Sequence, residues 1–419
     1  MVRRSALPNG LRIVSEQIDG VPSVTVGIWV ESGSRFEPRH LGGISHFLEH
    51  LLFKGTERRS AAQIAEEIDA VGGVLNAFTG KEYTCYYARV LAEHTPLATD
   101  LLADLFLHSR LDREEIDRER TVILQEISQS EDTPDDYVHD LFNLHYWPGH
   151  TLSFPVCGTA ATVGGLGREH FVDFLAARYR PDRLVISAAG AITHEQLEAW
   201  AARDFGHLTG SATLADGAEP VIQRGVFHVQ KPLEQVHVCF GAPGVAQEAA
   251  DRYAAYLVNT ALGGGMSSRL FQEVREKRGH AYSVYSFLSS YRDTGYFGIY
   301  VGTAAEWVED CLAIIVRELA AVAREGLTAV ELSRVKNQLK GNMLLGLETS
   351  DSRMSRVAKN EIYVGRDVPL NEVAARIDAV TNDEVVAFAA RLTRPEDLGV
   401  ALLGDLGERR IDASLLTAQ

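Results

Sequence analysis

The sequence predicts an α+β protein of two homologous domains, each a mainly antiparallel sheet packed with helices. Strand-like runs follow one another as hairpins instead of alternating regularly with helices, which favours antiparallel sheets. The order of strands and helices in the first half recurs in the second half at an offset of roughly 213 residues, which is too long for a solenoid repeat. A chain of 419 residues also suits more than one compact unit.

The first half opens with two expected strands around a turn, within residues 11–35. In VTVGIWV, residues 24–30, apolar side chains alternate with smaller or polar neighbours, which is typical of a half-buried strand. Residues 74–90, VLNAFTGKEYTCYYARV, are rich in β-branched and aromatic residues and predict a strand and a hairpin. These segments would supply the sheet of the first domain.

Helical patterns separate and follow these strands. The expected helices are one through His46 and three more over residues 60–73, 94–109 and 112–130. In the segment 60–73, Ser60 can accept a backbone N–H group as an N-cap, and Gly72 and Gly73 end the helical pattern. These helices would pack against the sheet.

The second half repeats this layout. Residues 235–244, QVHVCFGAPG, resemble the strand pattern SVTVGIWVESG, and DRYAAYLVNTAL takes the place of the helix through His46. Residues 294–319 repeat a strand followed by a helix. The predicted domains are therefore residues 1–210 and 223–419, joined by a small, polar linker over residues 211–222.

Composition narrows the class of protein. The formal net charge of −16 makes nucleic acid and anionic membrane surfaces poor partners. The four cysteines are widely spread without a CxxC pair, which argues against a disulfide framework. No apolar run follows Arg3 and Arg4, and no eighteen uncharged apolar residues stand together. We therefore expect a cytoplasmic protein.

The stretch GGISHFLEHLLFKGT, residues 42–56, carries the clearest chemical signal. On a helix, His46, Glu49 and His50 fall within an arc of about 100°. Two imidazoles one turn apart can hold one zinc ion, and the carboxylate beside them can take a proton from a water molecule. H-x-x-E-H is a zinc peptidase motif. The plainer reading, two histidines satisfied at a helix edge, is disfavoured because the helix is otherwise apolar nearly all round.

A catalytic zinc usually takes a third protein ligand from elsewhere in the chain. In the helix expected over residues 112–130, Glu119 and Glu126 follow the same steps of three and four residues as Ile116 and Ile123. Both glutamates would then lie on the inward side of that helix. The spacing alone leaves both as candidate ligands.

Three motifs resemble the pitrilysin and mitochondrial processing peptidase family: GGISHFLEHLLFKGT, GGVLNAFTGKEYTCYYARV and ERTVILQEI. The similarity is closest to the zinc-bearing subunit of the processing peptidase and to its two-domain bacterial relatives, and it covers nearly the whole chain. It implies one zinc per chain, held by His46, His50 and Glu126. It further implies that Glu49 is the general base and that Glu119 supports the site.

The resemblance also assigns residues that handle substrate. Asn76 and Ala77 would lie on an edge strand that pairs with an extended peptide, which agrees with the general ability of a free strand edge to bind a peptide. Arg275 and Tyr282 match an arginine and a tyrosine that act at the scissile carbonyl, where they would stabilise an oxyanion.

These features predict a zinc endopeptidase that cleaves unfolded or short peptides, held extended inside a dimeric chamber. The family builds its chamber from four homologous domains, so a two-domain chain is expected to form a homodimer, with a heterodimer as the alternative. Two other functions fit the sequence less well. A non-catalytic member of the family is disfavoured by the intact zinc motif, and a zinc hydrolase of another substrate class is disfavoured by the edge strand around Asn76.

Overall fold

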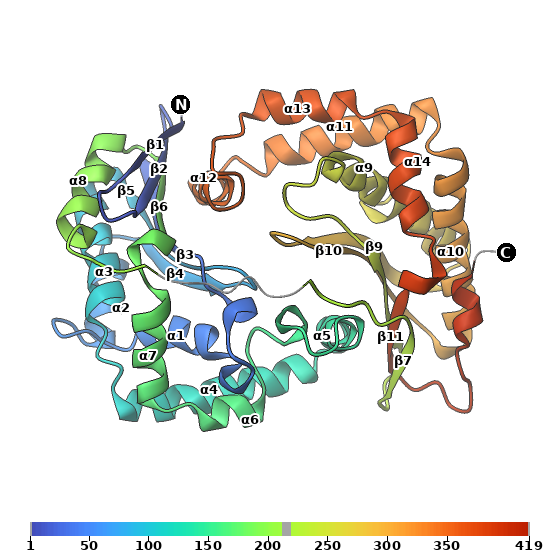
Figure 1. The fold of residues 1–419 in the computed structure, drawn as a ribbon, viewed down its shortest axis with the longest axis horizontal. Helices are drawn as coiled ribbons and strands as arrows, with labels where there is room; N and C mark the ends of the chain where they lie inside the picture. The colour runs from blue at the N-terminus through green and yellow to red at the C-terminus, as the bar shows by residue number, and fades with distance from the viewer. Residues whose placement is uncertain (1, 212–218, 418–419) are drawn as a thin grey trace. The chain divides into compact units, whose positions relative to one another are not determined.

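The computed structural model describes residues 2–211 and 219–417 (Figure 1). Residues 212–218, which make up most of the predicted linker, lie outside the described residues. The chain divides into two compact units. The described part of the first unit is residues 2–129, 154–211 and 346–367, and that of the second is residues 130–153, 219–345 and 368–417.

The first unit contains a six-stranded sheet in the order β1-β2-β6-β3-β5-β4. Its strands are β1 (Val2–Ala6), β2 (Arg12–Gln17), β3 (Ser23–Val30), β4 (Val74–Thr79), β5 (Thr84–Leu91) and β6 (Leu184–Gly190). Only the β2–β6 pair is parallel. The two strands predicted within residues 11–35 exist, but β6 lies between them, because its seven fully buried residues suit the middle of a sheet.

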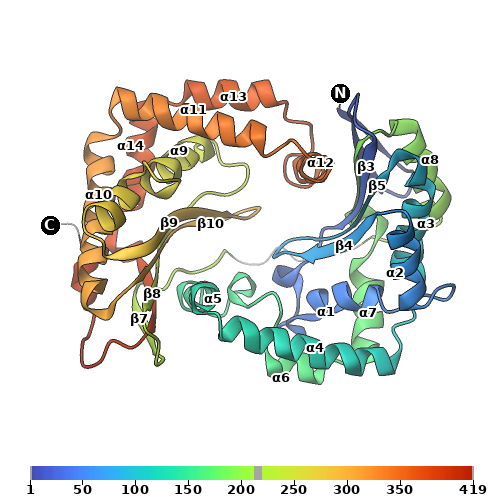
Figure 2. The same cartoon turned by 180° about the vertical axis from the view of Figure 1, so that it is seen from behind.

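Helices cover both faces of this sheet (Figure 2). They are α1 (Ile44–Leu52), α2 (Ala61–Ala70), α3 (Thr95–His108), α4 (Arg113–Glu131), α6 (Ala160–Gly165), α7 (Arg168–Arg178), α8 (His194–Phe205) and α12 (Ser350–Val364). The predicted cap of α2 is confirmed, since Ser60 Oγ accepts the N–H of Gln63 and the Gln63 side chain accepts the N–H of Ser60.

The second unit repeats the topology of the first. Its sheet has the order β7-β11-β8-β10-β9, with one parallel pair, β7–β11. The strands are β7 (Gly225–Gln230), β8 (Val236–Pro243), β9 (Ala281–Ser290), β10 (Gly295–Thr303) and β11 (Gly399–Gly404). Taken in chain order, these five strands occupy the positions of β2, β3, β4, β5 and β6. The predicted α+β class with two homologous domains is confirmed.

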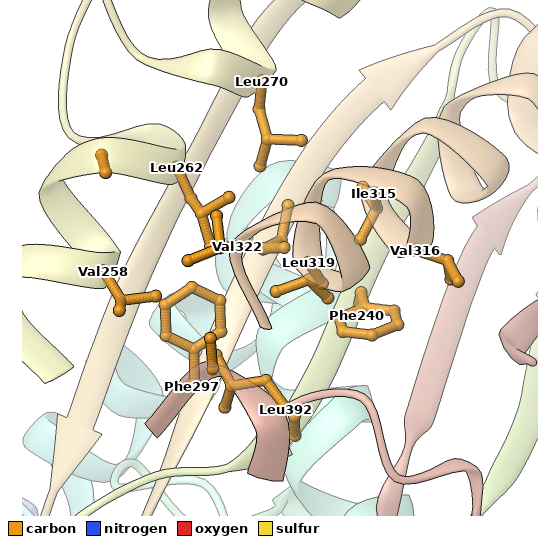
Figure 3. Close-up of a cluster of buried hydrophobic side chains, with 14 of the residues drawn as sticks. Phe240, Val258, Leu262, Leu270, Phe297, Ile315, Val316, Leu319, Val322 and Leu392 are labelled. Carbon is orange, nitrogen blue, oxygen red and sulfur yellow. The ribbon is translucent and has the colours of Figure 1, made fainter. Parts of the chain in front are cut away.

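A large apolar core holds most of the helices of the second unit to one face of its sheet. The helices are α5 (Pro134–Tyr146), α9 (Arg252–Gly263), α10 (Val308–Glu325), α11 (Ala329–Leu345), α13 (Leu370–Ala379) and α14 (Asn382–Arg391). Figure 3 shows Phe240 and Phe297 from the sheet packed among Leu262 of α9, Leu319 of α10 and Leu392, which follows α14, all fully or almost fully buried.

Each sheet is also covered by a helix from the other half of the sequence. Helix α12 packs on β2, β3 and β6, where Met354 and Val357 bury Trp29. Helix α5 packs on β8 and β11, where Phe142 belongs to a second apolar cluster, with Cys239 and Leu403 of the sheet. The predicted boundaries, 1–210 and 223–419, leave each of these helices with the sheet of its own half. The observed contacts differ from this prediction: α12 buries its apolar side on the first sheet, and α5 buries its apolar side on the second.

Candidate metal centre

Helix α1 carries the H-x-x-E-H motif, and Glu37 anchors its first turn. The two carboxylate oxygens of this buried side chain accept the N–H groups of Gly43 and Ser45, each at 2.8 Å. Burial raises the pKa of Glu37 despite the opposing effect of these hydrogen bonds. Gly43 has φ of +93°, and a Cβ there would lie 2.6 Å from the carbonyl oxygen of Cys157, so only glycine fits this approach. The start of α1 is therefore fixed by contacts outside the helix.

The sides of α1 differ in chemistry. Its buried apolar residues are Ile44, Phe47, Leu48, Leu51 and Leu52. His46, Glu49 and His50 are only partly buried and stand on the remaining side. The apolar side thus ties the helix to the core of the first unit and leaves the three polar groups together.

Helix α4 supplies the two glutamates that its spacing pointed to. Ile116, Ile123 and Glu119 are almost completely buried on the inward side, and Glu119 is 6% exposed. The Glu126 side chain is 42% exposed. The helix therefore buries the Glu119 carboxylate and leaves the Glu126 carboxylate accessible to a metal ion.

The structure brings His46, His50 and Glu126 together. One ligand atom from each of the three residues lies within 4.8 Å of the others. Glu126 Oε2 is 3.8 Å from His46 Nε2 and 3.6 Å from His50 Nε2. Among residues 2–211 and 219–417, this is the one group of three or more His, Cys, Asp or Glu side chains arranged to hold a metal ion.

These three residues fit zinc in geometry and in protonation state. With metal–ligand distances of about 2.1 Å, two ligands of a tetrahedral zinc stand about 3.4 Å apart, close to the observed separations. Burial, with a smaller contribution from the charge of His50, lowers the pKa of His46 to about 4. His46 is therefore neutral near pH 7, as a metal ligand must be. Two histidines with one glutamate form a known ligand set of catalytic zinc.

Glu119 orients the second histidine instead of joining the ligands. His50 Nδ1–H donates to Glu119 Oε2 at 3.0 Å, which leaves Nε2 free on the side of Glu126. The other oxygen of Glu119 is 2.6 Å from Lys54 Nζ. A carboxylate on the second ring nitrogen fixes the tautomer of a metal-binding histidine and raises its basicity.

Glu49 stands beside the ligands without belonging to them. Burial raises the pKa of its carboxyl group, and the nearby charge of Glu126 acts in the same direction, whereas interactions with Thr79 and His50 oppose the rise. A carboxyl group whose pKa is moved towards neutrality suits proton transfer. Since Thr79 is the last residue of β4, Glu49 also lies next to the edge of the sheet.

Strand β4 is an edge strand, and α1 lies against it (Figure 2). Its one partner in the sheet is β5. Asn76 is exposed, and its Oδ1 accepts the N–H of Ala77 at 2.8 Å. The side chain of Asn76 therefore occupies a backbone group that an added strand would use.

Arg275 and Tyr282 lie in the second unit, whereas the three candidate ligands lie in the first. The guanidinium carbon of Arg275 is 4.8 Å from the centre of the Tyr282 ring and 4.7 Å from that of Phe271. Tyr282 is 79% exposed and belongs to β9, an edge strand of the second sheet. Arg275 and Tyr282 are therefore adjacent, with Tyr282 open to solvent and Arg275 partly exposed.

Sequence reasoning did not identify Glu37 or Lys54. Lys54 follows His50 by four residues, the spacing of neighbours on a helix, and the inward Glu119 needed a counter-charge. Those two signals together would have indicated it. Glu37 acts on a helix end across an intervening loop, and its sequence position carries no comparable signal.

The fold and this site define a class: a two-domain α+β protein with an H-x-x-E-H zinc peptidase motif. The model of the insulinase family, peptidase family M16, matches residues 12–160, and the model of the peptidase M16 inactive domain matches residues 165–339. Among related chains, the uncharacterized zinc protease YmxG of Bacillus subtilis is 42% identical over 97% of this chain and 99% of its own length. An uncharacterized zinc protease of Streptomyces coelicolor is 46% identical over 93% of this chain and 86% of its own.

The protein thus belongs to peptidase family M16, the pitrilysin family, and the predicted membership is confirmed. A solved structure titled as a peptidase M16 inactive domain from Pseudomonas fluorescens shares the fold, with a TM-score of 0.89 at 20% identity over 98% of this chain and 100% of that one. A protease from Helicobacter pylori has a TM-score of 0.87 at 20% identity, over 96% of this chain and 99% of that one. Within residues 2–211 and 219–417, no helix has the length and apolar character needed to span a bilayer.

Proposed function

We propose that the protein is a zinc endopeptidase that cleaves unfolded or short peptides bound in extended form. One observation carries the proposal: His46, His50 and Glu126 converge on one point, with Glu49 beside them and a free strand edge next to Glu49. The relatives named zinc proteases support the same chemistry. The proposed content is one zinc per chain.

Each residue has a defined part in this reaction. His46, His50 and Glu126 hold the ion, and Glu119 keeps His50 in the binding tautomer. Zinc, when bound, supplies Lewis-acid chemistry, which polarises a carbonyl group and makes a water molecule more acidic. Glu49 takes the proton of the attacking water and gives it to the leaving amine. The edge of β4 aligns the peptide.

The substitution Glu49→Gln tests this assignment. We expect the variant to keep zinc, because Glu49 is not a ligand, and to lose about 10²-fold or more in kcat, the usual scale for a lost general base. Zinc content and cleavage of an unstructured peptide should be measured on the same sample. Cleavage at the wild-type rate would remove Glu49 as the base, and loss of zinc would assign it a structural role.

We also propose a homodimer that encloses the substrate, with a heterodimer as the alternative. The chain has two homologous domains, and a chamber of the kind that the resemblance implies needs four. Arg275 and Tyr282 of one chain would then act at the zinc site of the other chain. Peptides are the proposed partners, and a cytoplasmic location is proposed from the sequence.

Mixing two inactive variants distinguishes action between chains from action within one chain. Glu49→Gln and Tyr282→Phe chains would each be impaired alone. A mixed dimer contains one site with both residues intact, so activity should recover towards one working site per dimer. If subunit exchange is demonstrated by mass and activity does not recover, the two residues act within one chain or with a different partner.

A further inference from the structure

The outer edge of β4 carries the backbone groups of Leu75, Ala77 and Thr79, where Asn76 Oδ1 accepts the N–H of Ala77 and Glu49 interacts with the backbone of Thr79. The β4–β5 hairpin closes with a hydrogen bond from the N–H of Gly80 to the carbonyl oxygen of Tyr83, at 2.8 Å. Hydrogen-bonded and non-hydrogen-bonded pairs alternate along an antiparallel ladder, and the β4–β5 register has no shift. The three residues therefore occupy non-hydrogen-bonded pairs, and their N–H and C=O groups point away from β5.

The side chains of the same three residues lie on the face of the sheet that α1 covers. Leu75 and Ala77 pack in the apolar core that includes α1, whereas Phe78 packs on the opposite face of the sheet with Trp29. Residues directly opposite one another on paired strands project to the same face. An added strand would therefore direct the side chain opposite Leu75 to the side of α1.

A groove of about 470 Å³ lies at that point, between α2, β4 and the end of α1. Lys54 and Asp69 line its polar part, and its apolar lining residues are Phe53, Ala61, Ile64, Ala65, Ile68, Val74 and Leu75. The four from α2 are spaced by three, one and three residues and so form one side of that helix. The two alanines leave space that larger side chains would fill.

We propose that this groove receives one large apolar side chain of an extended peptide paired with β4. Leu75 lines the groove and belongs to the free edge, so the groove continues the binding edge without a break. Same-face positions recur about every 7 Å along a strand. Leu75 is two residues from Ala77 and four from Thr79, which lies beside Glu49. The selected side chain stands two to four residues from the cleaved bond.

This inference rests on the proposed function for its substrate, but a binding measurement tests it separately. The probe is a fluorescent, unstructured, polar peptide in which a single Phe replaces Ala at successive positions. Affinities are measured by anisotropy on zinc-loaded Glu49→Gln protein, so that the peptide remains intact. We expect Phe at one position to strengthen binding by about 10-fold, the effect of burying one large apolar side chain.

Two tryptophan variants in the Glu49→Gln background locate the effect. Ala65 is exposed on α2 and lines the groove, so Ala65→Trp should fill it and abolish the gain from Phe. Ala62 is exposed on the same helix and does not line the groove, so Ala62→Trp should retain the gain. Equal far-UV circular dichroism and zinc content show that both variants are folded.

The outcomes separate the inference from the proposed function. A gain that survives Ala65→Trp, or no gain at any position, overturns the groove assignment. If the Phe peptide binds as expected and the wild-type protein cleaves no peptide, the groove stands and the proposed peptidase activity fails. If the wild type cleaves peptides without any positional preference for Phe, the activity stands and the groove assignment fails.

Discussion

At the scale of single residues, the orientation of His50 depends on the charged groups of Glu119 and Lys54. Glu119 is almost fully buried, and its two oxygens contact His50 Nδ1 and Lys54 Nζ. A buried carboxylate is stable only with such partners. Lys54 therefore stabilises the ionised Glu119 that in turn orients His50, although it is not itself a ligand.

Replacing Lys54 tests this chain of contacts. In Lys54→Met, Glu119 loses its ammonium partner, and we expect zinc affinity to fall by about 10- to 100-fold, as for other outer-shell changes. Lys54→Arg keeps a cation and should retain most of the affinity. The measurement is competition with a chelator at fixed pH, with circular dichroism as the control for folding. Wild-type affinity in Lys54→Met would exclude the role.

At the scale of elements, a hydrogen-bonded network around one buried carboxylate joins the segment after α1 to α3. Asp104 of α3 is 1% exposed and accepts hydrogen bonds from Thr56, Arg58 and Arg59, at 2.8, 2.9 and 2.8 Å. Burial raises the pKa of Asp104, but the hydrogen bonds from Arg59 and Arg58 outweigh it and lower the pKa overall. The network fixes the segment that connects α1 to α2.

We expect Asp104→Asn to lower the free energy of unfolding by about 2 kcal/mol, because charge-assisted hydrogen bonds to the buried carboxylate are lost while Arg58 and Arg59 keep Asp100 as a charged partner. Since the folded-state pKa is depressed, this contribution is present above the unfolded pKa of about 4 and is lost as pH falls through the folded value. Urea unfolding at pH 7 and near pH 3 measures both effects. Asp112→Asn, at a 48% exposed ion pair, is the control and should change stability little. Equal stability of both variants would contradict the account.

The sequence predicted elements whose signals are local. Ser60 marks the start of α2, and the spacing of apolar residues in α1 and α4 indicates which side of each helix is buried. The placement of β6 between β2 and β3 was not predicted, because long-range parallel pairing leaves no mark on the neighbouring residues. At the site, the motif identified His46 and His50, whereas helical spacing left Glu119 and Glu126 both open and the family resemblance selected Glu126. The contacts of Glu37 and Lys54 depend on tertiary structure.

At the scale of the whole molecule, the two halves of the sequence are not independent. The face of the first sheet that bears Trp29 is covered by α12, and Trp29 Nε1–H lies 3.3 Å from Met354 Sδ. An amphipathic helix shows that it will bury one side, but its sequence does not show which sheet receives it. This is why the exchange of α5 and α12 was not predicted.

Separate production of the two halves tests the exchange. A fragment of residues 1–210 lacks α12 and exposes Val14, Trp29 and Val185, so we expect it to bind a hydrophobic dye and to unfold without cooperativity. Fusing residues 346–367 to this fragment through a flexible linker should restore a cooperative transition. A fragment 1–210 that is monomeric and unfolds cooperatively by itself would contradict the assignment of α12 to the first unit.

The most direct test of the account is the zinc content of purified protein, measured by mass spectrometry of the metal after dialysis. We expect one zinc per wild-type chain and almost none in His50→Ala, because that change removes one of three ligand atoms that lie within 4.8 Å of one another. His94→Ala, at a partly exposed pair with Glu93 outside the site, should retain one zinc. Full zinc retention by His50→Ala, or no zinc in the wild type, would contradict the account.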